Sequence, residues 1–244
     1  MPDPTSLSDH LGLVLSLFDR QAAAWPSKYA PGGRLTYRLA RVGGTVLRQV
    51  PEQGRVLDLG CGTGELARWL AATGLAVVGC DISCEMLRGA AAGSATEDSG
   101  TPARWLRLDP DWRRLPFADG CFDAVTASSV LEYAADPAAV LGECARVLAP
   151  GGVLVCTVPD LRHPVRWCEW LSRPAARYVN WPAGWAKWQD YRRYLRTSRQ
   201  RHLCRWWELT ASRAGLTSGL AVPVDSLLTP LRLLCFEREA GPPG

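Results

Sequence analysis

The chain has 244 residues, of which 47% are hydrophobic, and its formal net charge is +4. This size and composition fit one α/β domain, or one domain with an insertion, and they exclude overall disorder. A net charge this small does not by itself indicate a nucleic-acid partner.

Two helices are predicted before the first strand. Apolar side chains recur at helical spacing from Leu7 to Phe18, and a second helical pattern runs from Leu35 to Val50.

Strand and helix patterns then alternate along the chain. Strands are predicted at residues 55–59, 76–80, 104–108, 122–127 and 153–158. Helices are predicted at residues 65–73 and 82–92, and a third begins after Asp136, which can cap it. The alternation predicts a doubly wound parallel sheet, whose ligands bind beyond the carboxyl ends of the strands.

The loop Gly60-x-Gly62-x-Gly64 lies directly between a predicted strand and a predicted helix. Glycines permit positive φ and close approach of a ligand to the backbone. The nicotinamide fingerprint needs a glycine where this chain has Glu65. The negative charge of Asp58 and Glu65 disfavours a pyrophosphate and favours a ligand that carries an ammonium and a sulfonium.

Five segments, the first of which contains this loop, follow one another in a specific order. They are Val-Leu-Asp-Leu-Gly-Cys-Gly-Thr-Gly at 56–64, Gly-Cys-Asp-Ile-Ser at 79–83, Leu-Pro-Phe-Ala-Asp-Gly-Cys-Phe-Asp at 115–123, Val-Leu-Glu-Tyr at 130–133 and Arg-Val-Leu-Ala-Pro-Gly-Gly at 146–152. Together they resemble class I S-adenosylmethionine-dependent methyltransferases of the group that includes the ubiquinone and menaquinone methyltransferases. The resemblance implies a Rossmann-like doubly wound sheet of seven strands with the last one antiparallel, at residues 232–238, and a helix over residues 201–216 before the sixth strand.

The resemblance also implies which residues bind S-adenosylmethionine. The methionine part of the cofactor is expected against Asp58, Gly60, Cys61 and Gly62. Asp81 is expected to hold the ribose hydroxyls, with Ile82 beside the adenine and Met86 near it.

Three more cofactor contacts follow from the resemblance. Counting back from Leu115 places the adenine-binding aspartate at Asp111, whose neighbour Trp112 offers its backbone N–H to the ring. Asp109 is the competing assignment for this aspartate. The carbonyl of Ala127 is expected to bind the cofactor ammonium.

The N-terminal segment matches a pattern that often precedes this fold. Phe18-Asp19-x-x-Ala22-x-x-Trp25 implies that residues 1–50 form a helical cap that closes over the cofactor. Arg38 and Arg41 are both candidates for binding the methionine carboxylate.

The segment after the fifth strand has a different composition. Residues 161–207 hold seven of the eleven tryptophans, and residues 161–206 hold eleven basic and two acidic residues. We expect residues 160–202 to be an inserted lid over a hydrophobic or aromatic small molecule. A lipid or membrane-surface substrate, an RNA substrate and a solvated basic face over core tryptophans are the alternatives, with nucleic acid disfavoured by the lack of a separate binding module.

Candidate catalytic residues are few. Methyl transfer from a sulfonium mainly requires orientation of the nucleophile and exclusion of water. Tyr133 stands where many relatives have a substrate-facing histidine, and His163 and His202 are the other candidates. No convincing base stands out, so nitrogen, oxygen and sulfur acceptors all stay open.

The sequence thus predicts a single-domain enzyme that methylates a small molecule, in natural-product biosynthesis. A lipid, quinone-like or RNA substrate is the alternative, as is a non-catalytic S-adenosylmethionine-binding protein. The nine scattered cysteines form no Cys-x-x-Cys pair, so no metal site is expected. The chain shows no signal peptide and no run of ~20 apolar residues, so a cytoplasmic protein without a membrane span is expected. The oligomeric state is open.

Overall fold

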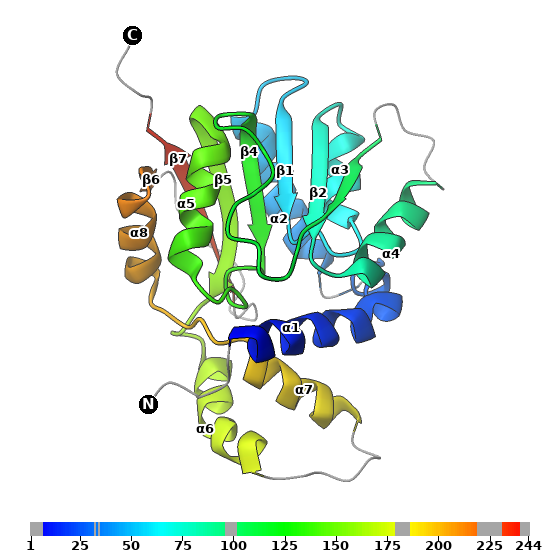
Figure 1. Cartoon of the computed structure of the whole chain (residues 1–244), viewed down its shortest axis with the longest axis vertical. Helices are drawn as coiled ribbons and strands as arrows, with labels where there is room; N and C mark the ends of the chain where they lie inside the picture. The colour runs from blue at the N-terminus through cyan, green and yellow to red at the C-terminus, as the bar shows by residue number, and fades with distance from the viewer. Residues whose placement is uncertain are drawn as a thin grey trace.

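The computed structural model describes residues 7–31, 33, 35–95, 102–178, 186–218 and 231–239. These residues form one seven-stranded sheet in the order β3-β2-β1-β4-β5-β7-β6 (Figure 1). The strands are β1 (Arg55–Leu59), β2 (Ala76–Asp81), β3 (Arg104–Arg107), β4 (Phe122–Ser128), β5 (Leu148–Pro159), β6 (Leu216–Ser218) and β7 (Leu231–Arg238). Strands β1 to β5 are parallel, whereas β7 is antiparallel to β5 and β6. The predicted Rossmann-like sheet with an antiparallel last strand is confirmed.

The helices are α1 (Leu7–Gln21), α2 (Thr36–Gln49), α3 (Glu65–Ala71), α4 (Cys84–Ser94), α5 (Pro137–Val147), α6 (Pro164–Tyr178), α7 (Ala186–Thr197) and α8 (Cys204–Arg213). Helices α1 to α5 and α8 lie close to their predicted positions, whereas α6 and α7 lie in the expected lid, for which no helix was predicted. Two caps set helix starts: Ser83 Oγ accepts the Met86 N–H, and Asp136 Oδ1 accepts the N–H groups of Ala138 and Ala139. Strand β5 is longer than predicted because its first residues, with Gly151 at φ 75°, bulge against β4 before regular pairing resumes at Val153.

Alternate residues of the central strands face opposite sides of the sheet, and each side is covered by helices. On one side Leu57, Val125 and Leu154 pack in a buried cluster that includes Leu141 of α5 and Trp207 of α8. On the other side Val56, Ala124 and Val155 pack in a cluster that includes Val46 of α2 and Leu70 of α3. Two layers of helices therefore fix the sheet between them.

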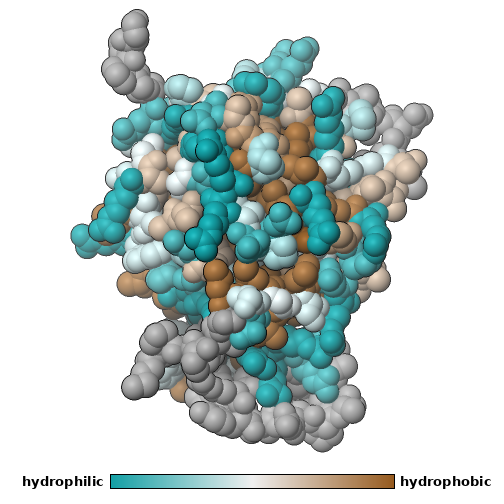
Figure 2. Space-filling model, viewed as in Figure 1, coloured by the Kyte–Doolittle hydropathy of each residue, from teal (hydrophilic) through white to brown (hydrophobic). Residues whose placement is uncertain are grey.

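The connection between β3 and β4 is a loop without a helix. Its Leu115 is 1% exposed and inserts into the cluster below α5. Hydrophobic residues gather over β1 and β2 in Figure 2, on the part of the sheet that no helix covers. Val78 and Leu106 are half-buried there.

The carboxyl ends of the parallel strands all lie at one edge, where α1 crosses them (Figure 1). Helix α7 contacts both α1 and α6, so the segment after β5 also lies on this edge. Over the described part of the chain, every helix is too short or too polar to cross a membrane.

Candidate functional site

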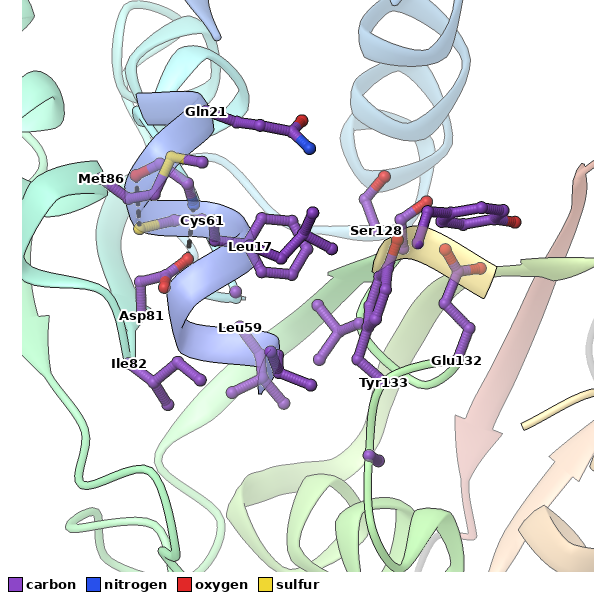
Figure 3. Close-up of a pocket in the computed structure, with 18 of the residues that line it drawn as sticks. Leu17, Gln21, Leu59, Cys61, Asp81, Ile82, Met86, Ser128, Glu132 and Tyr133 are labelled. Atoms are coloured by element: carbon purple, nitrogen blue, oxygen red, sulfur yellow. Dashed lines mark hydrogen bonds between the residues drawn. The ribbon is translucent and has the colours of Figure 1, made fainter. Parts of the chain in front are cut away.

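A cavity of about 1430 Å³ opens at the carboxyl ends of β1, β2 and β4. Its walls include side chains from α1 and α2, from the loops after these strands, and from α6 and α7. Figure 3 shows Cys61, Asp81, Ile82 and Met86 on one side of it and Ser128, Glu132 and Tyr133 on the other, with Leu17 and Gln21 of α1 in front.

The glycine loop forms the floor of the first side. Gly60 and Gly62 have φ of 68° and 57°, which side-chain-bearing residues rarely adopt. The N–H groups of Gly60 and Cys61 both donate to Cys80 O, at 2.7 and 3.0 Å. A Cβ on Gly60 would lie 2.3 Å from Val130 Cγ2, and one on Gly62 would lie 3.3 Å from Trp25 Nε1. Glycine is therefore required both by the backbone turn and by close packing.

Asp81, at the end of β2, is held by backbone donors. Its Oδ2 accepts the Gly62 N–H and its Oδ1 accepts the Ser83 N–H, each at 2.9 Å. Burial raises the pKa of Asp81, and these backbone donors oppose the shift. The carboxylate is thus fixed in orientation at the cavity wall, as a ribose-binding group must be.

Asp58, at the end of β1, is 2% exposed and lines the same cavity. Its Oδ1 accepts the Thr126 hydroxyl at 2.6 Å. Burial raises the pKa of Asp58 from 3.8 to about 7; the Thr126 hydrogen bond lowers it, and the charges of Asp81 and Glu65 raise it. Each of these carboxylates makes ionisation of the others less favourable. A positively charged ligand on this side of the cavity would therefore stabilise their ionised forms.

The loop after β3 supplies the next part of the wall. Asp111 and Trp112 line the cavity, which favours Asp111 over Asp109 as the adenine-binding candidate. The Trp112 N–H already donates to Asp109 O at 3.1 Å, so the proposed adenine contact would have to share or replace this bond.

Of the remaining predicted cofactor residues, three line the cavity and one does not. Cys61, Ile82 and Met86 line the cavity, and burial raises the pKa of the Cys61 thiol well above its usual value, which keeps it neutral. Ala127 is fully buried in the core, and the wall next to it is formed by Ser128 and Ser129. A role for its carbonyl stays a prediction.

Between the two candidate arginines, the structure places Arg38 at the cavity. Arg38 Nη1 donates to Ser129 Oγ at 3.0 Å, and Ser129 has the positive φ of 58°. The Arg41 guanidinium instead lies 5.6 Å from the ring of Tyr37, on the outer side of α2.

The N-terminal pattern from Phe18 to Trp25 lies beside the cavity. Phe18 and Trp25 line the cavity and contact each other edge to face at 5.7 Å. Asp19 Oδ1 accepts the Ser83 hydroxyl at 2.5 Å, which ties α1 to the end of β2. Ser83 is completely buried, so this contact joins α1 to the segment next to Asp81 away from solvent.

Of the three predicted catalytic residues, one lines the cavity and two lie outside it. Tyr133 lines the cavity and contacts Phe18 edge to face at 5.0 Å. His163 lies outside the lining, and its Nδ1 accepts the Val165 N–H at 3.3 Å at the start of α6. His202 also lies outside it, stacked on Trp206 at 3.7 Å. Burial lowers the pKa of His202.

Among the described side chains of the basic segment, the aromatic ones that line the cavity are tyrosines. Tyr191 and Tyr194 of α7 line the cavity. Trp167 and Trp170 of α6 are 68% and 70% exposed, because they lie on the outer side of the helix, and Trp207 is buried in the core. Trp181 and Trp185 lie outside the described residues. Trp167, Trp170 and Trp207 therefore do not form this wall.

Sequence reasoning missed Glu132, which is 3% exposed and lines the cavity. It also missed Arg166 and Glu169 of α6, a buried ion pair in the same wall. The signal for Glu132 is its place in Val-Leu-Glu-Tyr, directly before the predicted substrate-facing Tyr133. Over the described residues, no group of three or more histidine, cysteine or acidic side chains could hold a metal ion.

These residues fit S-adenosylmethionine on chemical grounds. A cation would lie near Asp58, a ribose near the fixed oxygens of Asp81, and a carboxylate within reach of Arg38. The donor set of this side thus matches each charged or polar part of that molecule, whereas a pyrophosphate would face two buried carboxyl groups.

Known proteins are similar to this chain in sequence and in fold. Residues 57–156 match a family described as "Methyltransferase domain". A demethylmenaquinone methyltransferase of Thermus thermophilus is 48% identical over 103 residues, which are 41% of this chain and 45% of the relative. A ubiquinone biosynthesis O-methyltransferase of Sodalis glossinidius is 32% identical over 173 residues, 68% of this chain and 65% of the relative. The first match spans less than half of the relative's length.

A solved structure extends the likeness of fold to nearly the whole chain. Magnesium protoporphyrin IX methyltransferase from Synechocystis PCC 6803, with bound S-adenosylhomocysteine, has a TM-score of 0.70 at 17% identity and covers 93% of this chain and 99% of its own. The matched family, the sequence relatives and the glycine loop identify residues 57–156 as a class I S-adenosylmethionine-dependent methyltransferase domain, and the solved structure shows that the surrounding fold is shared.

Proposed function

We propose that this protein transfers a methyl group from S-adenosylmethionine to a small, largely apolar acceptor. The observation that carries the proposal is one continuous cavity with two chemically different sides. The side at Asp58 and Asp81 suits the charged and polar cofactor. The opposite side carries Ser128, Glu132 and Tyr133 (Figure 3), and the lining of the cavity also contains apolar and aromatic groups such as Leu11, Val14, Leu39, Val140 and Tyr194.

The N-terminal and inserted segments have distinct roles in this proposal. Residues 1–50 act as the cap, since α1 carries Phe18 to the cavity and the turn after α1 carries Trp25. Residues 160–202 act as the substrate lid, since α6 and α7 supply its far wall. Exclusion of water by both segments would favour the displacement at the methyl group.

A quinone-like phenol is the acceptor class that we propose to test first. The relatives of this chain include proteins named for demethylmenaquinone and for ubiquinone biosynthesis. The matched family domain ends at residue 156, before the proposed lid, so this support is weaker for the acceptor than for the methyl donor. Natural-product biosynthesis stays a prediction without support from these relatives.

A mass-shift screen tests the proposal. The protein is incubated with S-adenosylmethionine that carries a deuterated methyl group and with a panel of reduced naphthoquinones, benzoquinols and simple phenols. One labelled methyl group on an acceptor is the expected result. If the labelled methyl group is found on RNA or on lipid in parallel samples and on no small molecule, the small-molecule acceptor is contradicted.

A binding experiment separates catalysis from simple cofactor binding. Calorimetric titration should show binding of S-adenosylhomocysteine and none of NADH. Binding without methylation of any sample would support a non-catalytic S-adenosylmethionine-binding protein, and binding of NADH alone would contradict the cofactor assignment.

A further inference from the structure

Glu132 is a buried carboxyl group in the acceptor side of the cavity. It follows β4, is 3% exposed, and its Oε2 has no hydrogen-bond partner among the described residues. Its backbone is held firmly, since its carbonyl accepts the Gln200 N–H at 3.1 Å. A buried oxygen without a partner destabilises the free protein, so the group needs another explanation.

Structural ion pairing does not explain Glu132. The nearby cation Arg166 donates from Nη1 to both oxygens of Glu169, at 2.9 and 2.8 Å, and to the Tyr194 hydroxyl at 2.6 Å. Arg201 also donates to Glu169. Glu169 thus already serves as the carboxylate partner that ties α6 to the chain after α7.

A second unpartnered oxygen faces the same cavity. Ser128 Oγ is buried without a partner in the described part of the chain, and Ser128 lines the cavity at the end of β4. Figure 3 shows Ser128, Glu132 and Tyr133 on the side opposite Asp81 and Met86. A carboxyl and a hydroxyl together provide the partners that an acceptor hydroxyl requires.

The electrostatic surroundings allow Glu132 to exchange a proton. Burial raises its pKa above its usual range, while Arg166, Arg38, Arg201 and a hydrogen bond with Tyr133 oppose the shift. Tyr194 of α7 also faces the group. These arginines come from α2, from α6 and from the segment after α7, and they stabilise the ionised form that accepts a proton.

We propose that Glu132 is the general base that binds and deprotonates a hydroxyl group of the acceptor, with Ser128 Oγ as its hydrogen-bonding neighbour. The inference rests on the methyl transfer proposed above and specifies its acceptor atom as oxygen. Tyr133, predicted from the sequence, shapes the wall next to this base.

The step balances without any other reactant. S-adenosylmethionine supplies the methyl group, and the electron pair of the broken S–CH₃ bond stays on its sulfur. The acceptor oxygen forms the new O–CH₃ bond with its own electron pair, and its proton passes to Glu132 Oε2. Glu132 then returns the proton to water when the product leaves.

Binding provides a test that does not depend on turnover. Protein saturated with S-adenosylhomocysteine is titrated with 1-naphthol and with naphthalene, which differ by one hydroxyl group. We expect the wild type to bind 1-naphthol about tenfold more tightly, because the buried carboxylate accepts its hydroxyl. Glu132→Leu should remove this preference, and the thermal midpoint controls for a loss of folding, because the substitution also removes the partner of the Tyr133 hydroxyl. An equal affinity of the wild type for both probes would overturn the inference.

Turnover tests the proton transfer itself. With a phenol that the wild type methylates, Glu132→Gln should lower kcat by about a hundredfold and remove the rise of kcat/KM with pH that ionisation of Glu132 causes. Affinity for S-adenosylhomocysteine should stay unchanged. Glu85→Gln is the matched control, since Glu85 is an exposed carboxylate of α4 outside the cavity. A Glu132→Gln variant with the wild-type rate and pH profile would refute the base.

Failure of the two proposals gives different results. If the wild type methylates no sample, the proposed function fails, and the hydroxyl preference still decides whether Glu132 holds the acceptor hydroxyl. If thiols and amines are added to the panel and only these are methylated, the proposed function stands and the oxygen acceptor is wrong.

Discussion

Asp81 Oδ2 accepts the backbone N–H of Gly62 at 2.9 Å, so the end of β2 is tied to the glycine loop that follows β1. The same carboxylate accepts the Ser83 N–H through Oδ1. One side chain therefore sets the shape of the loop and presents charged oxygens to the cavity.

Asp81→Asn is expected to weaken binding of S-adenosylhomocysteine by tenfold or more, about 1.4 kcal/mol, because a charged hydrogen bond to the ribose is lost. Asparagine keeps the size of the side chain and one acceptor oxygen for the loop. Calorimetric titration measures the affinity, and the thermal midpoint controls for a distorted loop. An unchanged affinity would remove Asp81 from the ribose site.

Asp58 is expected to link cofactor binding to proton release. Its pKa is raised to about 7 by burial, so near pH 6 the free protein holds this carboxyl mainly protonated. A bound cation favours the ionised form, so S-adenosylmethionine should displace a proton below pH 7 and none at about pH 9. Calorimetry in two buffers with different ionisation enthalpies measures the number of protons released.

Asp58→Asn is the control for this linkage. It should abolish the proton release and also change the stability of the ligand-free protein. Since the folded pKa lies above the unfolded value of 3.8, the wild type loses folding stability as pH rises from about 4 to about 7. The variant should lack this part of the pH dependence, and a variant that releases as many protons as the wild type would rule out Asp58 as their source.

Local signals in the sequence predicted the five parallel strands and the glycine loop, whereas the antiparallel last strand was implied by the family resemblance. The order of strands and helices follows from alternating periodicity, and the glycine loop follows from spacing. The periodicity and the glycine spacing are each properties of residues that are close in the sequence. The same holds for the start of α5, which Asp136 caps directly before Pro137. Asp58 and Asp81 could be assigned because strand ends converge at one edge of a parallel sheet.

The acceptor side could not be predicted in the same way. It depends on how α6 and α7 lie against the sheet, which no local pattern specifies. Arg166 and Tyr194 meet across 28 residues, and Glu132 lies beside both although it precedes them by more than 30. The position of a histidine relative to the cavity is not encoded locally either: His163 contacts the start of α6 and His202 stacks on Trp206, and both lie outside the lining of the cavity.

Gly64→Ala tests the packing behind the glycine loop. Gly64 has φ of 81°, and a Cβ there would lie 2.4 Å from the Trp105 ring and 3.0 Å from Ala90 Cβ. The strained backbone and the overlap should together lower the free energy of unfolding by about 2–4 kcal/mol.

Gly142→Ala is the matched control for Gly64→Ala. Gly142 lies inside α5, and a Cβ at this position would have no neighbouring atom within 4 Å among the described residues. The substitution should raise the free energy of unfolding by roughly 0.5–1 kcal/mol, because alanine favours a helix interior. Urea denaturation measures both variants, and equal stability of the two would contradict the packing described around Trp105.

Tyr133→Phe distinguishes a substrate-contacting ring from a proton-accepting hydroxyl. Burial and the neighbouring Glu132 raise the pKa of Tyr133 well above 10, so its hydroxyl cannot act as a base near neutral pH. Phenylalanine keeps the edge-to-face contact with Phe18, so kcat should stay within about threefold of the wild type. Loss of the hydrogen bond that lowers the pKa of Glu132 should instead shift the rise of kcat/KM to higher pH. The pH profile of methylation measures both effects, and a loss of activity at every pH would make the tyrosine hydroxyl itself essential.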